Sequence, residues 1–192
     1  QKEIILSLLS GRDTFGFIPP GSGRSLCYWI PTVYKKLITV VVSPSLSSMQ
    51  KQIEQLTSLN IPSDYCTKDK SEKDKELLIN DLKSENPKTL ILFITPELFS
   101  TFSWKEIFRM LRLKNKLGLL VFDDVHSVTP WGCNYRPVYR NIHEVRKNQF
   151  YTVPLLALSS LSTPKVQEAV ISHFVYKQNE IFLNSYNRLH VT

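Results

Sequence analysis

The sequence predicts an α/β fold in which a mostly parallel sheet is covered by helices on both faces. Short, uninterrupted apolar runs alternate along the chain with stretches that have helical spacing. Apolar runs of this length are typical of strands that are buried on both faces. The composition, 42% hydrophobic and 21% charged over 192 residues, supplies a core and argues against wholesale disorder. We expect one domain over residues 1–192.

Four apolar runs are the predicted strands, and a weaker run is a fifth. They cover residues 38–42, 89–94, 117–122 and 154–158, with 14–18 as the weaker one. Strands that alternate with helices pair in parallel through right-handed crossovers. Because ligands of such sheets gather beyond the carboxyl ends of the strands, the polar residues that follow each run are the candidates for a site.

Helical spacing appears between the runs. Apolar residues step by three and four in two segments, Leu46, Met49, Ile53 and Leu56, and then Val166, Val170 and Phe174. Ser103 and Glu106 have the spacing of a capping box, which predicts a helix that begins after Ser103. Thr163 before Pro164 predicts another helix start. Residues 68–75 are highly charged, and we interpret them as a solvated loop that runs into an exposed helix.

The charge balance and the cysteines limit the function classes. Lys and Arg number 24 against 17 Asp and Glu, a net charge of +7, which permits contact with a polyanion such as DNA without requiring it. Cys27, Cys66 and Cys133 lie far apart and form no C-x-x-C pair. We therefore expect no structural zinc, reduced thiols and an intracellular location. The apolar runs are too short to cross a membrane, and residues 1–3 resemble a cut inside a longer protein rather than a signal peptide.

A glycine-containing loop follows the first predicted strand. It reads Gly21, Ser22, Gly23, Arg24 and Ser25, with a helix expected near Ser25. Glycines let backbone N–H groups surround a phosphate, the helix N-terminus adds positive potential, and the Ser25 hydroxyl is a candidate Mg²⁺ ligand. A flexible turn is the alternative, but the strand–loop–helix context favours a phosphate loop. Arg24 stands where such loops carry lysine, and its wide planar guanidinium is no equivalent at a tight site.

Two acids follow the most hydrophobic run of the chain. Asp123 and Asp124 stand where nucleotide hydrolases place an Mg²⁺-holding aspartate and then a carboxylate that orients water. Two solvated acids at a strand end are the alternative interpretation, and the glycine loop earlier in the chain favours the first. Asp124 is one methylene shorter than glutamate, so its carboxylate is withdrawn by more than about 1 Å, which can cost roughly 100-fold in rate.

Together these segments resemble the RecQ helicase family over nearly the whole chain. Residues 11–13 through 25–31 resemble its first motif and following helix, and Gln1 matches its adenine-reading glutamine. Residues 126–139, with His126, Trp131-Gly132 and Tyr135-Arg136-Pro137 in that order, are similar to the aromatic-rich loop that couples DNA binding to ATP use. The resemblance implies a RecA-like (P-loop NTPase) three-layer sandwich.

The resemblance also implies ligands and partners. ATP with Mg²⁺ would bind at Gln1, the 21–25 loop and Asp123, with His126 beside the catalytic acids. Two segments resemble those that contact the DNA backbone, and their residues are Ser43, Pro44, Thr95, Pro96 and Glu97. The aromatic loop places Trp131, Tyr135 and Arg136 together, either as a stacking platform for single-stranded or junction DNA or packed on the parent domain. Protein partners and a nuclear location are further expectations.

The departures from the family fall mainly in its catalytic motifs. Arg24 replaces lysine, Asp124 replaces glutamate, Pro130 replaces glutamine, Leu161 and Ser162 break a Thr-Ala-Thr motif, and Pro20 replaces threonine. We therefore expect a degenerate lobe with weakened ATP and Mg²⁺ binding that serves as a DNA-linked or protein-binding scaffold in genome maintenance. The alternatives are an excised lobe of an active ATP-dependent 3′–5′ DNA helicase and a pure protein-interaction domain. The 192 residues contain no second lobe with its catalytic arginine, and no zinc or winged-helix part.

Overall fold

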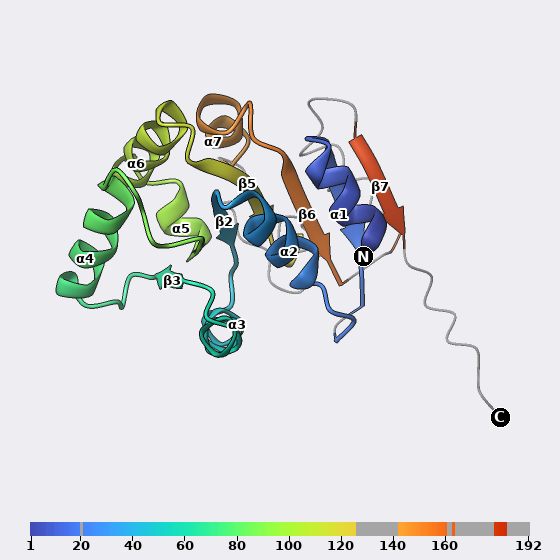
Figure 1. The fold of residues 1–192 in the computed structure, drawn as a ribbon, viewed down its shortest axis with the longest axis horizontal. Helices are drawn as coiled ribbons and strands as arrows, with labels where there is room; N and C mark the ends of the chain where they lie inside the picture. The colour runs from blue at the N-terminus through green and yellow to red at the C-terminus, as the bar shows by residue number, and fades with distance from the viewer. Residues whose placement is uncertain (20, 126–141, 161–162, 164–178, 184–192) are drawn as a thin grey trace.

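The computed structural model describes residues 1–19, 21–125, 142–160, 163 and 179–183. Their strands form one seven-stranded sheet in the order β3-β4-β2-β5-β6-β1-β7 (Figure 1), and every neighbouring pair is parallel. The strands are β1 Asp13–Phe17, β2 Ile38–Val42, β3 Ser63–Cys66, β4 Ile91–Ile94, β5 Leu117–Phe122, β6 Leu155–Ser159 and β7 Asn179–Leu183. The helices are α1 Lys2–Leu9, α2 Leu26–Lys35, α3 Leu46–Ser58, α4 Glu72–Lys83, α5 Pro96–Phe99, α6 Phe102–Leu113 and α7 Ile142–Gln149.

The predicted strands are confirmed: 38–42 and 117–122 have the predicted bounds, and the bounds of the other three shift by one or two residues. The run at 89–94 forms a strand only from Ile91. The N–H of Thr89 donates to the Asp81 carboxylate instead of to a neighbouring strand. The run at 154–158 becomes 155–159, since Pro154 has no N–H to donate to the sheet. The predicted 14–18 strand is β1, one residue earlier.

Alternating side chains of the central strands enter two separate hydrophobic clusters. Val40 and Phe122 belong to one cluster, and Val41 and Val121 belong to the other. Side chains of successive strand residues point to opposite faces of a sheet, so both faces are buried. This explains why β2 and β5 are continuous apolar runs without polar alternation.

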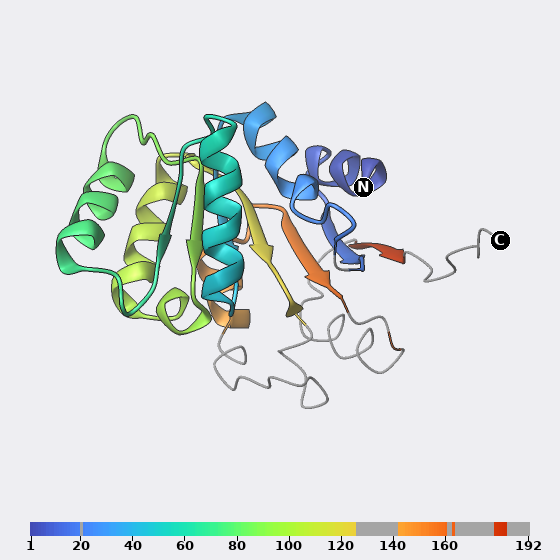
Figure 2. The same ribbon diagram turned by 90° about the horizontal axis from the view of Figure 1, so that it is seen from below.

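Helices cover both faces of the sheet, as Figures 1 and 2 show. The cluster that contains Val41 includes residues of α1, α2 and α3, and the cluster that contains Val40 includes residues of α4, α5, α6 and α7. Burying one large apolar side chain stabilises a fold by roughly 1.5–3 kcal/mol, so these two clusters supply the main cohesion. The prediction of a three-layer α/β sandwich is confirmed.

The helix predicted from Leu46, Met49, Ile53 and Leu56 is α3. Ser45 is its N-cap, and the Ser45 side chain accepts a hydrogen bond from the N–H of Ser48. Met49 and Leu56, both residues of this helix, are buried. The charged 68–75 segment is, as predicted, a loop that leads into α4, where the Ser71 side chain accepts a hydrogen bond from the N–H of Asp74.

The capping-box prediction at Ser103 and Glu106 is wrong. Helix α6 begins two residues earlier, with Thr101 as its N-cap, so Ser103 lies inside the first turn. The preceding turn is the reason, because the Thr101 hydroxyl and N–H both donate to the carbonyl of Leu98. The chain therefore turns into the helix at Thr101. The predicted helix around Val166 and its start at Pro164 lie outside the described residues.

None of the helices within the described ranges is long and apolar enough to span a membrane.

Candidate functional site

Three neighbouring strands bring polar residues to one edge of the sheet. Ser43 directly follows β2, Thr95 follows β4 and Asp123 follows β5. In the sheet, β2 lies between β4 and β5. The N–H of Ser43 donates to the carbonyl of Ile94 at 3.1 Å, and the N–H of Asp123 donates to the carbonyl of Val42 at 2.9 Å. These bonds hold the carboxyl ends of the strands level, as the parallel arrangement predicts.

The predicted phosphate loop connects β1 to α2. Gly21 and Gly23 have φ angles of +74° and +70°, a left-handed conformation that glycine adopts without steric cost. The N–H of Leu26 then donates to the carbonyl of Gly23 at 3.1 Å as the chain enters α2. Ser25 is the N-cap of this helix, and its side chain makes no capping hydrogen bond there. The loop thus delivers Ser25 to the start of a helix, as predicted.

Gln1 lies against the same loop. Its side-chain amide donates a hydrogen bond to the carbonyl of Ser22. A Cβ atom on Gly23 would lie 2.8 Å from the Nε2 atom of Gln1, so a glycine at this position lets the amide approach. Gln1, the residue directly before α1, therefore lies against the loop that follows β1.

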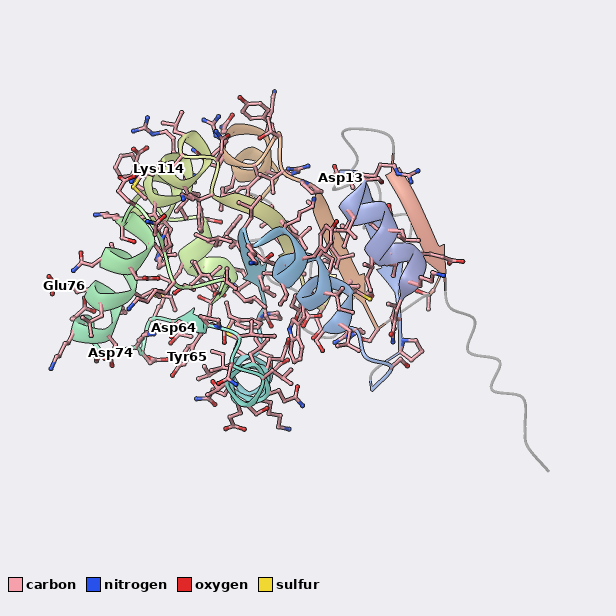
Figure 3. The ribbon with its side chains drawn as sticks, viewed as in Figure 1. Asp13, Asp64, Tyr65, Asp74, Glu76 and Lys114 are labelled. Atoms are coloured by element: carbon pink, nitrogen blue, oxygen red, sulfur yellow. The ribbon has the colours of Figure 1, made fainter. Side chains whose placement is uncertain are left out.

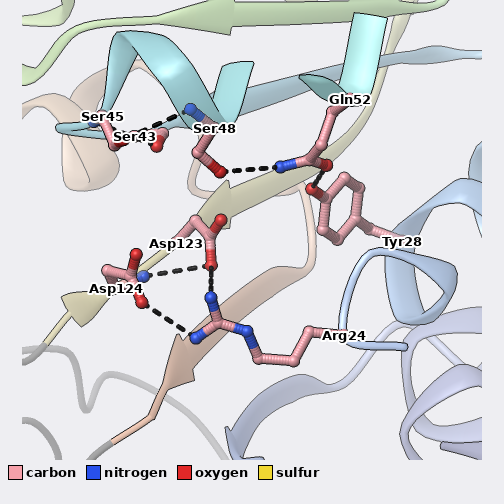
Figure 4. Close-up of polar contacts among 8 residues, drawn as sticks. All are labelled: Arg24, Tyr28, Ser43, Ser45, Ser48, Gln52, Asp123 and Asp124. Atoms are coloured by element: carbon pink, nitrogen blue, oxygen red, sulfur yellow. Dashed lines mark hydrogen bonds and ion pairs between the residues drawn. The ribbon is translucent and has the colours of Figure 1, made fainter. Parts of the chain in front are cut away.

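Arg24 lies between the two acids that follow β5 (Figure 4). Its Nη1 atom is 2.9 Å from Oδ1 of Asp124, and its Nη2 atom is 3.5 Å from Oδ1 of Asp123. The Arg24 side chain is only 18% exposed. Burial alone lowers the pKa of Arg24, but the charges of Asp123 and Asp124 outweigh that effect and raise it. The guanidinium is therefore a fixed positive charge at this site.

The two acids differ in their surroundings. Burial raises the pKa of Asp123 to about 6, although the neighbouring charge of Arg24 opposes the rise. The backbone N–H of Asp124 donates to Oδ1 of Asp123 at 3.1 Å. Asp124 itself has a φ angle of +55°, a left-handed conformation that aspartate tolerates better than most residues. With its backbone in this conformation, Asp124 has its carboxylate against the Arg24 guanidinium.

A pocket of about 200 Å³ opens beside the loop. Its lining comes from the loop, α2, α3 and the end of β5, and consists of Gly21, Gly23, Arg24, Ser25, Tyr28, Ser48, Gln52 and Asp123. Ser25 and Asp123, the two predicted Mg²⁺ ligands, thus face one space. A cavity of this kind with a few convergent polar groups is the expected form of a small-ligand site.

One wall of the pocket was not predicted from the sequence. The Tyr28 hydroxyl donates to Oε1 of Gln52, and Nε2 of Gln52 lies 3.5 Å from Oγ of Ser48 (Figure 4). Ser48 and Gln52 are one turn apart on α3. The sequence does contain a signal for this wall: Ser48 and Gln52 are four residues apart, so they lie on the same side of α3, and α3 follows the strand next to β5.

The residues at this edge do not fit a magnesium ion. Mg²⁺ is held through one or two carboxylates and needs near-ideal octahedral oxygen coordination, but one oxygen of each carboxylate, Oδ1 of Asp123 and Oδ1 of Asp124, already faces the Arg24 guanidinium. A divalent cation there would adjoin a positive charge. Within the described parts of the chain, no three His, Cys, Asp or Glu side chains gather as a metal site.

The predicted DNA-contact residues after β2 and β4 share this edge. Ser43 is fully buried, and its hydroxyl accepts a hydrogen bond from the N–H of Ser45 at 3.4 Å; Pro44 lies between them. Thr95 is the N-cap of α5, and its buried hydroxyl has no hydrogen-bond partner among the residues described. Pro96 and Glu97 form the first turn of α5.

Four of the predicted site residues lie outside the described ranges. They are His126, Trp131, Tyr135 and Arg136. Pro20, Pro130, Leu161 and Ser162, which depart from the family pattern, also lie outside.

The sequence of the chain is similar to those of known helicases. The chain matches the DEAD/DEAH box helicase family over residues 1–170. It is 35% identical over 179 residues to the ATP-dependent DNA helicase Q5 of Rattus norvegicus, which covers 93% of this chain and 18% of the relative. It is 34% identical over 190 residues to the RecQ-like DNA helicase BLM of Xenopus laevis, covering 98% of this chain and 14% of the relative. The chain thus spans less than a fifth of either relative.

The fold has solved counterparts as well. The DUF1998 helicase MrfA, in a crystal structure bound to DNA, superposes with a TM-score of 0.66 at 15% sequence identity, over 94% of this chain and 26% of the other. At this identity the likeness concerns the fold alone, which is that of a RecA-like helicase domain.

The fold, the glycine loop and the paired acids are those expected of a RecA-like helicase lobe. The chain belongs to the DEAD/DEAH box helicase family, in which its relatives are RecQ-type DNA helicases, and it corresponds to their N-terminal lobe. The RecQ resemblance inferred from the motifs is confirmed.

Proposed function

We propose that this chain is a single RecA-like lobe over residues 1–192 that no longer supports efficient ATP hydrolysis and serves as a DNA-linked or protein-binding scaffold. The observation that carries the proposal is the pairing of Arg24 with both Asp123 and Asp124. The basic residue of the phosphate loop and the acids after β5 thus pair with one another.

This pairing impairs catalysis in two ways. A nucleotide phosphate that recruits Arg24 must first separate it from two carboxylates, which weakens ATP binding. Asp124 is engaged by the guanidinium and is a methylene shorter than glutamate, so it is badly placed to orient water, and a displacement of about 1 Å can cost roughly 100-fold in rate. ATP would therefore bind weakly at Gln1 and the 21–25 loop, Asp123 would be a poor Mg²⁺ ligand because it faces Arg24, and His126 would contribute little.

DNA is the proposed partner because the relatives named above are DNA helicases. The net charge of +7 favours a polyanion. Of the residues predicted to contact the DNA backbone, Pro44, Thr95 and Glu97 are partly exposed at the carboxyl edge of the sheet and would make these contacts, whereas Ser43 and Pro96 are buried. Trp131, Tyr135 and Arg136 would stack on unpaired bases. A nuclear location and protein partners in genome maintenance follow from the same relationship.

The test is hydrolysis by the full-length protein with and without single-stranded DNA. We expect no DNA-stimulated turnover from the wild-type chain. The Arg24→Lys/Asp124→Glu double variant should bind a fluorescent ATP analogue more tightly, while Arg109→Lys, a surface exchange in the Arg109–Glu106 pair, should change nothing. Robust turnover by the wild type would overturn the proposal.

The active-enzyme alternative rests on the similarity to the Q5 protein of Rattus norvegicus, an ATP-dependent DNA helicase. The same hydrolysis assay decides between the two. A pure protein-interaction domain would bind neither the ATP analogue nor DNA, so saturable binding of either ligand argues against it. DNA binding that weakens as salt is raised would point to phosphate contacts.

A further inference from the structure

We propose that Arg24 is the built-in cation of this site: its guanidinium replaces a divalent metal ion on Asp123 and Asp124, so that the acids of the wild-type chain bind none. The inference deepens the proposed function, because it concerns the same pocket. It also predicts a latent metal site that appears when the charge of Arg24 is removed.

Burial makes a cation necessary here. Asp123 is 3% exposed, and a buried carboxylate is costly unless it is paired and hydrogen-bonded. Asp124 brings a second carboxylate next to it, joined through the hydrogen bond from its N–H to Oδ1 of Asp123. In the part of the chain that the structure describes, Arg24 is the cation that forms ion pairs with these two acids.

The shape of the guanidinium suits two acids at once. Nη1 contacts Asp124 and Nη2 contacts Asp123, which a planar fork with donors in fixed directions achieves and a single ammonium does less well. Asp124 has a left-handed backbone conformation where its carboxylate pairs with Nη1. Arg24 therefore stands in for the metal and does not merely lie close to an empty metal site.

Oxygen ligands for a cation remain around Arg24. Asp123 lines the pocket together with the hydroxyl-bearing Ser25 and Ser48, and carboxylates and hydroxyls are ligands that hard divalent cations accept. The described residues lack a cluster of three acidic or imidazole ligands, so water would have to complete the coordination. With the guanidinium gone, two adjacent carboxylates without a counter-charge would attract such an ion.

The experiment measures Mn²⁺ binding to the full chain by electron paramagnetic resonance of the free ion, without nucleotide. We expect the wild type and Asp123→Asn to give the same weak background. Arg24→Gln should gain a site that binds Mn²⁺ about 10- to 100-fold more tightly than this background, because the adjacent positive charge that repels a cation is removed, and Mg²⁺ should compete for it. Arg24→Gln/Asp123→Asn should lose that site again.

A matched control uses the surface arginine. Arg109→Gln breaks the exposed pair with Glu106 and should leave Mn²⁺ binding at background. Far-ultraviolet circular dichroism establishes that each variant is folded. The comparison of wild type with Asp123→Asn needs no Arg24 variant, so it tests the proposal even if Arg24→Gln does not fold.

Two results would overturn the inference: a wild-type Mn²⁺ site that Asp123→Asn removes, or a folded Arg24→Gln variant without a new site. Both are independent of hydrolysis. A wild type that binds Mn²⁺ through Asp123 but does not turn over ATP would refute the built-in cation and leave the proposed function intact. Robust turnover would refute the proposed function by itself.

Discussion

The guanidinium of Arg146 lies against the carboxylate of Asp13, with Nη2 2.9 Å from Oδ1 and 3.1 Å from Oδ2. Both side chains are almost fully buried, at 4% and 3% exposure. Arg146 also donates through Nη1 to the carbonyl of Val153 at 2.5 Å, and the N–H of Leu155 donates to Oδ1 of Asp13 at 2.8 Å. The pair therefore connects β1, α7 and the start of β6.

Replacing one partner of this pair should destabilise the fold strongly. Asp13→Ala leaves the Arg146 charge buried without its carboxylate, which typically costs about 3–5 kcal/mol. The free energy of unfolding from urea denaturation measures the loss. Glu106→Ala is the control, because it breaks an exposed pair with Arg109 and should cost less than about 1 kcal/mol. Similar losses in the two variants would contradict this assignment.

Asp81 should make stability depend on pH in the acid range. Its carboxylate accepts the N–H groups of Lys88 and Thr89, each at 3.0 Å. Burial alone raises the pKa of Asp81, but these hydrogen bonds outweigh it and the pKa is lowered. A lowered carboxyl pKa stabilises the fold above the ordinary carboxyl range, and this contribution is lost as pH falls through the lowered value.

The variant Asp81→Asn should therefore be less stable than the wild type at neutral pH, by about 1 kcal/mol, because solvent screens this partly exposed carboxylate. The difference should shrink as the wild-type carboxylate is protonated. Urea denaturation of both chains across the acid range measures it, with Asp69→Asn, an exposed carboxyl, as control. A difference that stayed constant with pH would exclude a role for the Asp81 charge.

The hydrogen bond between Tyr28 and Gln52 should couple α2 to α3. Tyr28 is buried at the pocket wall, and its hydroxyl donates to Oε1 of Gln52. We expect Tyr28→Phe to cost about 1 kcal/mol and to leave Gln52→Ala with little further effect. A double-mutant cycle of unfolding free energies measures the coupling. Strictly additive losses would mean that the hydrogen bond contributes nothing.

The thiols of Cys27 and Cys66 should be inert in the native chain. Both are buried, free cysteines, and burial raises the pKa of each thiol. Since the thiolate is the reactive species, we expect both to react with a colorimetric disulfide reagent more than about tenfold more slowly than in urea. The assay uses a Cys133→Ser chain, so that only these two thiols report. Rapid reaction without urea would show that the α2 or β3 region opens readily.

Several features could be predicted from the sequence because they depend on local chemistry. Residues 38–42 and 117–122 are continuous apolar runs, and such runs suit strands buried on both faces. The glycine loop and the Asp123-Asp124 pair follow predicted strands directly, so parallel topology places them at the same edge. The class of fold and the position of the candidate site follow from these patterns.

The two edge strands, β3 and β7, could not be predicted from apolar runs in the sequence. Strand β3 is the short edge strand Ser63–Cys66, in which only Cys66 is buried, so it carries no apolar run. Among the described residues, strand β7 pairs with β1 alone, at the other edge of the sheet, and its sequence contains polar residues at 179 and 180. Edge strands are recognised by their pairing, which sequence periodicity does not report.

The sequence by itself determined the five strands that carry apolar runs, their parallel arrangement with helices between them, and the departures at Arg24 and Asp124. Only the tertiary structure decided that these two residues, 100 positions apart, lie 2.9 Å from each other, and that Asp13 meets Arg146 across 133 positions. The reason is physical: side-chain periodicity reflects burial along each element, whereas an ion pair depends on through-space geometry, which the strand register and the left-handed turn at Asp124 create.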